Sequence, residues 1–207
     1  MTRTSFTILA GFAAVGLTGA IVNAARKAPE AKGGFDADIS QYSQTMLNDG
    51  RKTFRYDTFG SEAFWGDALG LHKAVAGEKN GGVGPGVSPK TALAVGLKVD
   101  ADALPDALKK QIKAGKVNLE DPATTVALLK LNAVVGVTAF ADASGGVKSM
   151  GIQCALCHST VDDSFAPGIG KRLDGWPNRD LDPGLIISLT PGLADYATSK
   201  GLDPEAV

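Results

Sequence analysis

The stretch VVGVTAFADASGGVKSMGIQCALCH, residues 134–158, is the most informative part of this sequence. Its first seven residues are mostly β-branched or aromatic, residues 143–146 (ASGG) are typical of a turn, and residues 147–153 resume a strand-like pattern. The pattern predicts a β-hairpin over about residues 134–152. The second strand of that hairpin leads directly to Cys154.

Both cysteines of the chain lie in the five-residue segment Cys154-Ala155-Leu156-Cys157-His158. C-x-x-C-H is the attachment motif of c-type haem. Residues i and i+3 share one side of a helical turn, so Cys154 and Cys157 can reach two vinyl groups of one porphyrin. His158 is then directed over the ring, where an imidazole nitrogen can bind the iron. We therefore expect one covalently bound haem c.

The two cysteines have two alternative interpretations, a zinc site and a redox dithiol. A zinc site requires four ligands, and the only further histidine is His72. A redox dithiol normally lies at a helix start beside a βαβ pattern, and no such pattern precedes Cys154. Both readings are therefore less favoured than haem attachment.

The N-terminus has the pattern of an export signal. Arg3 is followed by an apolar run from Phe6 to Val22, and small residues close it at Val22-Asn23-Ala24. We expect a signal peptide over residues 1–24 and a periplasmic location. The alternative is a membrane anchor that is not cleaved.

Composition limits the remaining function classes. The net charge is -1, so nothing favours nucleic-acid binding, and the 44% of apolar residues can form a core.

We expect a mainly α fold with a flexible leader at 25–38, a helical N-terminal region at 39–133 and a haem-binding region at 134–207. Asp203-Pro204-Glu205 has the pattern of a helix start, which suggests a truncated C-terminus.

Caps and apolar spacing mark the expected helices. Ile39, Tyr42, Met46 and Leu47 predict one helix with a single apolar face. The others are expected from Ser61 to Ala76, from Ser88-Pro89, over 104–114, from Asp121-Pro122 to about Leu131, and from Asp182-Pro183.

The segment from Cys154 to Trp176 resembles a cytochrome c domain. In that family a Gly-Pro pair follows the motif, and its proline carbonyl accepts a hydrogen bond from the iron-binding imidazole. Pro167-Gly168 occupies that place here, in the reverse order. The resemblance implies that the Pro167 carbonyl orients His158 and makes it more basic.

The same resemblance implies that Leu173 packs over the ring and that Arg172 and Trp176 meet the haem propionates. Two further segments, FRYDTFGSEAFWGDALGLHKA (54–74) and LLKLNAVVGV (128–137), are similar to a group of bacterial cytochrome-like proteins of undefined role. That likeness names no substrate.

The sequence departs from the family pattern at the distal iron ligand, because no methionine follows the motif. His72 is the first candidate, on an apolar helical stripe, and Met46 and Met150 are others. An open sixth position remains an alternative.

We expect an electron carrier between redox partner proteins rather than an enzyme. The alternatives are a haem enzyme or a gas or peroxide sensor, or a haem subunit of a larger redox complex.

Overall fold

The computed structural model describes residues 33–203 and 205. The predicted signal peptide and most of the leader lie outside these residues, as does Pro204 of the expected C-terminal helix start. The chain divides into two units, residues 1–43 and 44–207, and α1 (Phe35–Tyr56) crosses their boundary.

Helix α1 confirms the first predicted helix but begins earlier than expected. Phe35–Asp38, assigned to the leader from sequence, already belong to its first turn. Asp36 and Asp38 in that turn and Arg55 in the last turn complement the helix dipole. None of its residues is buried, so its apolar side chains add nothing to the core.

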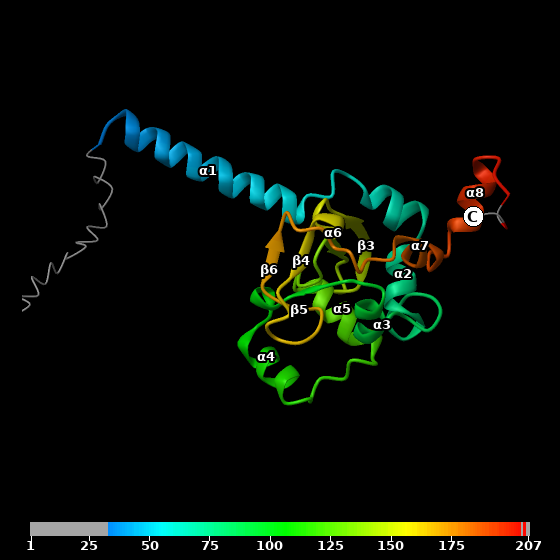
Figure 1. Cartoon of the computed structure of the whole chain (residues 1–207). Helices are drawn as coiled ribbons and strands as arrows, with labels where there is room; N and C mark the ends of the chain where they lie inside the picture. Colours follow the sequence, from blue (N-terminus) through cyan, green and yellow to red (C-terminus); the bar gives the residue numbers. More distant parts are fainter. Residues whose placement is uncertain (1–32, 204, 206–207) are drawn as a thin grey trace, which may run out of the picture. The chain divides into compact units, whose positions relative to one another are not determined.

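The remaining elements belong to the second unit (Figure 1). Its helical segments are η1 (Ala63–Ala68), α2 (Leu71–Ala76), η2 (Glu78–Asn80), α3 (Pro89–Ala94), η3 (Ala101–Ala103), α4 (Asp106–Lys113), α5 (Pro122–Lys130), α6 (Ala155–His158), α7 (Pro183–Ser188) and α8 (Leu193–Ser199). Its strands are β1 (Val99–Asp100), β2 (Val137–Ala141), β3 (Val147–Ile152), β4 (Ser159–Val161), β5 (Ile169–Gly170) and β6 (Arg172–Asp174).

The predicted hairpin is confirmed. Strands β2 and β3 pair antiparallel, with Val137 opposite Ile152 and Ala139 opposite Met150. Two further strand pairs were not expected, β1 parallel to β5 and β4 antiparallel to β6. In the described part of the chain, helices therefore predominate but are combined with three small two-stranded sheets.

The predicted caps start three of the helices. The side chains of Ser88, Asp121 and Asp182 each accept a backbone N–H of the first turn of α3, α5 and α7. A proline follows each of these three residues at the first helical position.

The single helix predicted from Ser61 to Ala76 is wrong. It is divided into η1 and α2 because Gly70 takes a left-handed conformation, with φ 67°. Ser61 also does not cap a helix through its side chain. Its hydroxyl donates to the Ile152 carbonyl and accepts from the Ile152 N–H, each at 2.9 Å. This residue therefore joins the η1 segment to the end of β3.

The core lies between the hairpin and helices α2 and α5, which contact one another. Its members are mostly aliphatic, and the buried cluster comprises Leu71, Val95, Val99, Ala101, Leu104, Leu128, Leu129, Ala133, Val134, Met150, Ile169 and Ile186. This packing holds the end of β3, and so fixes the position from which α6 starts.

Candidate functional site

The C-x-x-C-H segment forms the single helical turn α6, with Cys154 immediately before it. Its residues divide between two sides. Ala155 and Leu156 are buried, at 0% and 7% exposure, whereas Cys154, Cys157 and His158 are exposed. Both thiols are free. The turn is thus anchored by one side and presents its three chemically active side chains on the other.

Backbone hydrogen bonds hold this turn from both flanks. Before it, the Gln153 N–H donates to the Gly136 carbonyl at 3.0 Å. After it, the Gly175 N–H donates to the His158 carbonyl at 2.8 Å, and the Asn178 N–H donates to the Cys157 carbonyl at 2.9 Å. The segment 175–178 therefore lies along the turn. These bonds fix the backbone of the turn, from which the three exposed side chains leave.

Gly136 lies beneath the turn and was read from sequence only as part of a strand. Its φ is +84°, and a Cβ atom there would lie 2.2 Å from the Leu156 Cα. A glycine inside a strand-like run is a known sign of close backbone approach, so the signal was present in the sequence. Asn178 was missed as well, and no sequence pattern marks it. Its side chain donates to the Gly96 carbonyl at 2.9 Å.

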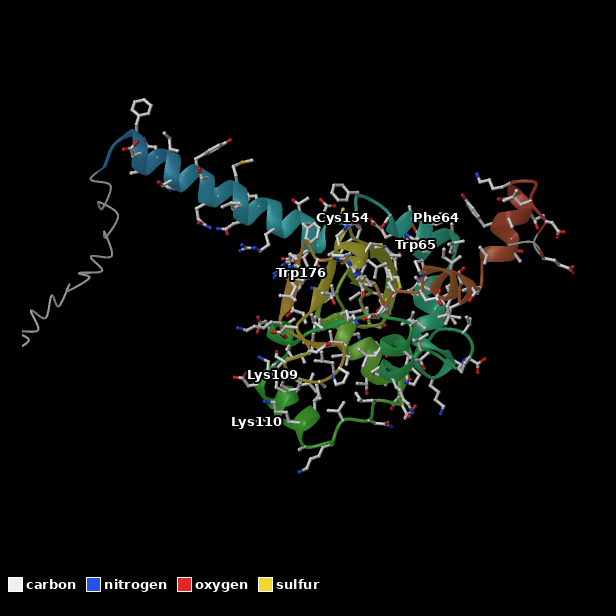
Figure 2. The ribbon with its side chains drawn as sticks, in the orientation of Figure 1. Phe64, Trp65, Lys109, Lys110, Cys154 and Trp176 are labelled. Carbon is white, nitrogen blue, oxygen red and sulfur yellow. The ribbon has the colours of Figure 1, made fainter. Side chains whose placement is uncertain are left out.

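Large aromatic side chains are exposed on the segments that border the turn. Trp176 is 62% exposed and follows Gly175, which is bonded to His158. Phe59 is 70% exposed and lies two residues from Ser61, which is bonded to Ile152. Figure 2 labels Cys154 and Trp176 on the same side of the second unit. Exposed aromatic rings on segments bonded to the turn and to the strand before it are suited to contact a flat apolar group.

Arg172 and Leu173 lie on β6, which pairs with the strand that follows His158. The Arg172 side chain is 3% exposed, with its Nε 3.1 Å from the Asp174 carboxylate. Among the described residues its Nη2 has no hydrogen-bond partner. Burial lowers the pKa of the Arg172 guanidinium, and the charge of Asp174 opposes this shift. Leu173 is half-buried opposite Thr160.

Asp174 is the centre of a small ionic cluster next to the turn. Its carboxylate accepts a hydrogen bond from Arg55 at 2.6 Å and from the Ser159 hydroxyl at 2.9 Å. Since Ser159 is the residue after His158, this cluster ties the end of α1 to the end of the turn. The sequence indicated Arg172 alone, because Arg55 and Ser159 lie 119 and 15 residues from Asp174.

Pro167 lies away from His158. It belongs to the loop between β4 and β5, where the adjacent Gly168 N–H donates to the Asp163 carboxylate at 2.8 Å. His158 precedes one end of the β4–β6 ladder, and this loop leaves the other end. The backbone hydrogen bonds of His158 join it to Cys154 and Gly175, and none of them reaches Pro167. The expected orienting bond stays a prediction.

His72 is also separated from the turn. It is 8% exposed and lies near Gly66 and Asp67, which contact the Ser149 part of β3. Three steps of extended strand, about 10 Å, lead from Ser149 to Ile152 before the turn begins. The structure does not bring His72 together with His158. Within the described residues, no group of three His, Cys, Asp or Glu side chains is placed to hold a metal ion directly.

The two methionine candidates have opposite environments. Met150 is 2% exposed and packed in the core, whereas Met46 is 54% exposed on α1. Met150 therefore cannot reach an iron on the exposed side of α6 without unpacking the hairpin. Core packing does not restrain the Met46 side chain.

His72 makes stability depend on pH. Burial lowers the pKa of this imidazole, the positive charge of Lys73 adds to the shift, and Asp67 opposes it. The unfolded chain then binds the proton more readily, near its ordinary pKa of about 6.5. The stabilisation from neutral His72 is present above that pH and is lost as the pH falls through the lower folded-state pKa.

We therefore expect the free energy of unfolding of the full chain to decrease between about pH 7 and pH 5. In His72→Gln that decrease should be smaller. Urea unfolding at a series of pH values measures it, with His158→Gln as the comparison. If the decrease disappears in His158→Gln and persists in His72→Gln, the assignment to His72 is wrong.

Comparison with known protein families, with curated proteins and with solved structures finds no match for this chain. In the part of the chain that the structure describes, no helix is both long enough and apolar enough to span a membrane. The assignment of function therefore rests on the C-x-x-C-H turn and its surroundings.

Proposed function

We propose that this chain is a periplasmic mono-haem c-type cytochrome that carries out one-electron transfer. The observation that carries the proposal is the division of α6 into a buried side and an exposed side. Cys154, Cys157 and His158 share the exposed side, and both thiols are free. This arrangement suits two thioether bonds to one porphyrin and an axial imidazole, because all three side chains are exposed and leave one helical turn.

The residues around the turn have defined roles in this proposal. Cys154 and Cys157 would hold the haem covalently, and His158 would bind its iron. Trp176 and Phe59 would cover part of the porphyrin, which explains large apolar side chains left exposed at this place. Arg172 would reach a propionate only if its buried side chain moved away from Asp174. When bound, the haem supplies a one-electron redox couple.

Electron transfer requires that the haem edge be accessible to a partner protein. A haem attached on the exposed side of α6 would not be enclosed by the core, because the core packs on the other side of the turn. Covalent attachment removes the need for a deep pocket to retain the group. Redox partner proteins are therefore favoured over a bound organic substrate.

A second candidate function is a gas or peroxide sensor or a haem enzyme with an open sixth iron position. It is favoured by the placement of His72 and Met150, since both are buried away from the exposed side of the turn. The third possibility is a haem subunit of a larger redox complex, for which the exposed apolar side chains of α1 would offer a docking surface.

The test is to mature the full chain with a haem-attachment system in the periplasm and to measure its mass and spectra. One covalently added haem supports the proposal, and an unmodified mass contradicts it. Carbon monoxide added to the reduced protein then separates the candidates. An unchanged spectrum favours electron transfer with a six-coordinate iron, whereas ready binding favours the sensor or enzyme.

A further inference from the structure

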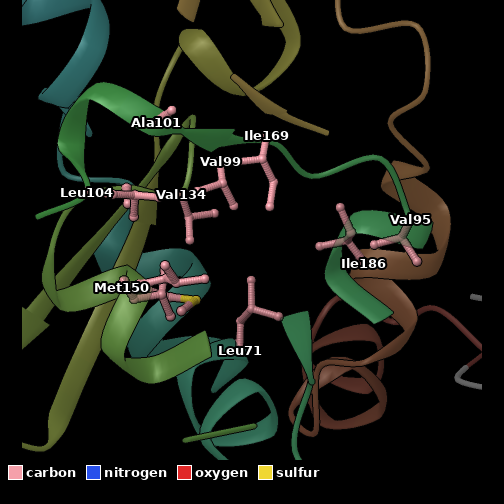
Figure 3. Packing of buried hydrophobic residues seen from close by; sticks show 12 residues of the cluster. Leu71, Val95, Val99, Ala101, Leu104, Val134, Met150, Ile169 and Ile186 are labelled. Atoms are coloured by element: carbon pink, nitrogen blue, oxygen red, sulfur yellow. The ribbon is translucent and has the colours of Figure 1, made fainter. Parts of the chain in front are cut away.

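The pairing of β4 with β6 places Asp174 at the end of the C-x-x-C-H turn. Asp174 lies opposite Ser159 in that ladder, and Ser159 is the residue that follows His158. The Ser159 hydroxyl donates to Oδ1 of Asp174 at 2.9 Å, and Ser159 is 0% exposed. The opposite end of the ladder leads to β5, where Ile169 packs in the core beside Val99 (Figure 3). Asp174 therefore holds the chain at the point where it leaves the turn.

The residue after Asp174 holds His158 itself. The Gly175 N–H donates to the His158 carbonyl at 2.8 Å, and the His158 N–H donates to the Cys154 carbonyl at 3.2 Å. The backbone of His158 is thus held on both sides of its Cα atom. Because the direction of a Cα–Cβ bond follows from the backbone, these contacts determine where the His158 side chain leaves the turn.

Two arginines hold the Asp174 carboxylate in place. Arg55 donates from Nε to Oδ2 at 2.6 Å, and the Nε of Arg172 lies 3.1 Å from Oδ1. The Arg172 side chain is 3% exposed, so its charge requires a carboxylate beside it. Both oxygens of Asp174 have a cationic partner, and such charge-assisted contacts are short and strong. The carboxylate is therefore a fixed point against which the end of the turn is held.

We propose that Asp174 is a positioning residue for His158. Together with the adjacent Gly175, and through Ser159, it keeps the Cα–Cβ bond of His158 in one direction, so that the imidazole meets an iron in one geometry. The proposal rests on the proposed function, in which His158 binds the haem iron. It deepens that function by assigning the geometry of the ligand to a carboxylate outside the C-x-x-C-H motif.

The haem-free full chain tests the backbone part of the proposal. Ser159→Ala removes the hydroxyl and leaves both arginine contacts of Asp174 in place. Amide hydrogen exchange at Gly175 reports on its bond to the His158 carbonyl. We expect this amide to exchange about tenfold faster in Ser159→Ala, because a hydrogen bond to a charged group is lost beside it. Asp174→Asn should accelerate exchange at least as much. If circular dichroism shows that Asp174→Asn does not fold, Ser159→Ala alone decides.

Ser164→Ala is the matched control. The Ser164 hydroxyl donates to the Asp162 carboxylate at 2.6 Å, which is the same chemistry as the Ser159 bond. These two residues follow the other end of the β4–β6 ladder. Exchange at Gly175 should therefore be unchanged in Ser164→Ala.

The haem-loaded chain tests the ligand geometry by electron paramagnetic resonance of the oxidised protein. We expect one set of g values for the unaltered chain and for Ser164→Ala. Ser159→Ala and Asp174→Asn should give shifted or multiple sets. Because Ser159→Ala keeps the charge of Asp174, a change in that variant reports geometry rather than charge.

Equal exchange at Gly175 in Ser159→Ala and Ser164→Ala overturns the proposal, whether or not haem is attached. Unchanged g values in Ser159→Ala overturn it as well. An unaltered chain that takes up no haem refutes the proposed function, and the geometry assigned to an iron ligand falls with it. The exchange result then still decides whether Asp174 holds the turn.

Discussion

Replacing Cys154 and Cys157 together by serine is expected to abolish covalent haem attachment completely. No other cysteine is present in the chain, and both thiols lie on the exposed side of α6. Each single serine variant should retain one thioether and a smaller amount of bound haem. The measurement is haem staining after denaturing electrophoresis, together with the intact mass.

The fold of the double variant should be kept, because neither side chain contributes to the core. Circular dichroism and urea unfolding of the haem-free chains provide this control. Haem that stays attached after denaturation of the double variant would refute the assignment of both cysteines. Loss of the folded state in the haem-free double variant would show instead that these side chains have a structural role.

Replacing Gly136 by alanine is expected to have the largest effect on stability of any change near the site. The residue has φ +84°, and the new Cβ would lie 2.2 Å from the Leu156 Cα and 2.3 Å from its N. These are backbone atoms of the C-x-x-C-H turn, so no side-chain rotation can relieve the contact. The left-handed backbone alone costs about 1 kcal/mol, and overpacking adds about 1–3 kcal/mol.

Gly145→Ala is the matched control for this prediction. Gly145 lies in the same hairpin and has φ +82°, but a Cβ there would meet nothing within 4 Å. This variant should lose only about 1 kcal/mol in the free energy of unfolding, against about 2–4 kcal/mol for Gly136→Ala. Haem attachment should also fall in Gly136→Ala and not in Gly145→Ala. Equal losses of stability in the two variants would mean that the close approach of the Leu156 backbone to Gly136 does not limit stability.

Local patterns predicted the parts of the fold that depend on neighbouring residues. The Asp-Pro and Ser-Pro pairs start α3, α5 and α7, since a cap and a fixed proline φ act within one turn. The hairpin was found because alternation and turn residues lie close together in the chain. The prediction of one helix from Ser61 was wrong because it relied on the helical spacing of apolar residues and gave too little weight to Gly70. The left-handed conformation of Gly70 separates η1 from α2.

The sequence by itself determined which functional groups are present at the candidate site. Two thiols and an imidazole at C-x-x-C-H spacing share one helical turn, since the positions in a turn follow from the helical period alone. It also marked the strand that leads into that turn.

Only the tertiary structure decided which side of the turn faces outward and what surrounds it. The partners that hold it, Gly136, Asn178 and Asp174, are brought there by chain reversals between residues distant in sequence. The burial of Leu156 against the core directs the cysteines outward, and the same packing separates His72 from His158. Such long-range contacts depend on how all apolar surfaces are buried together, which no local pattern encodes.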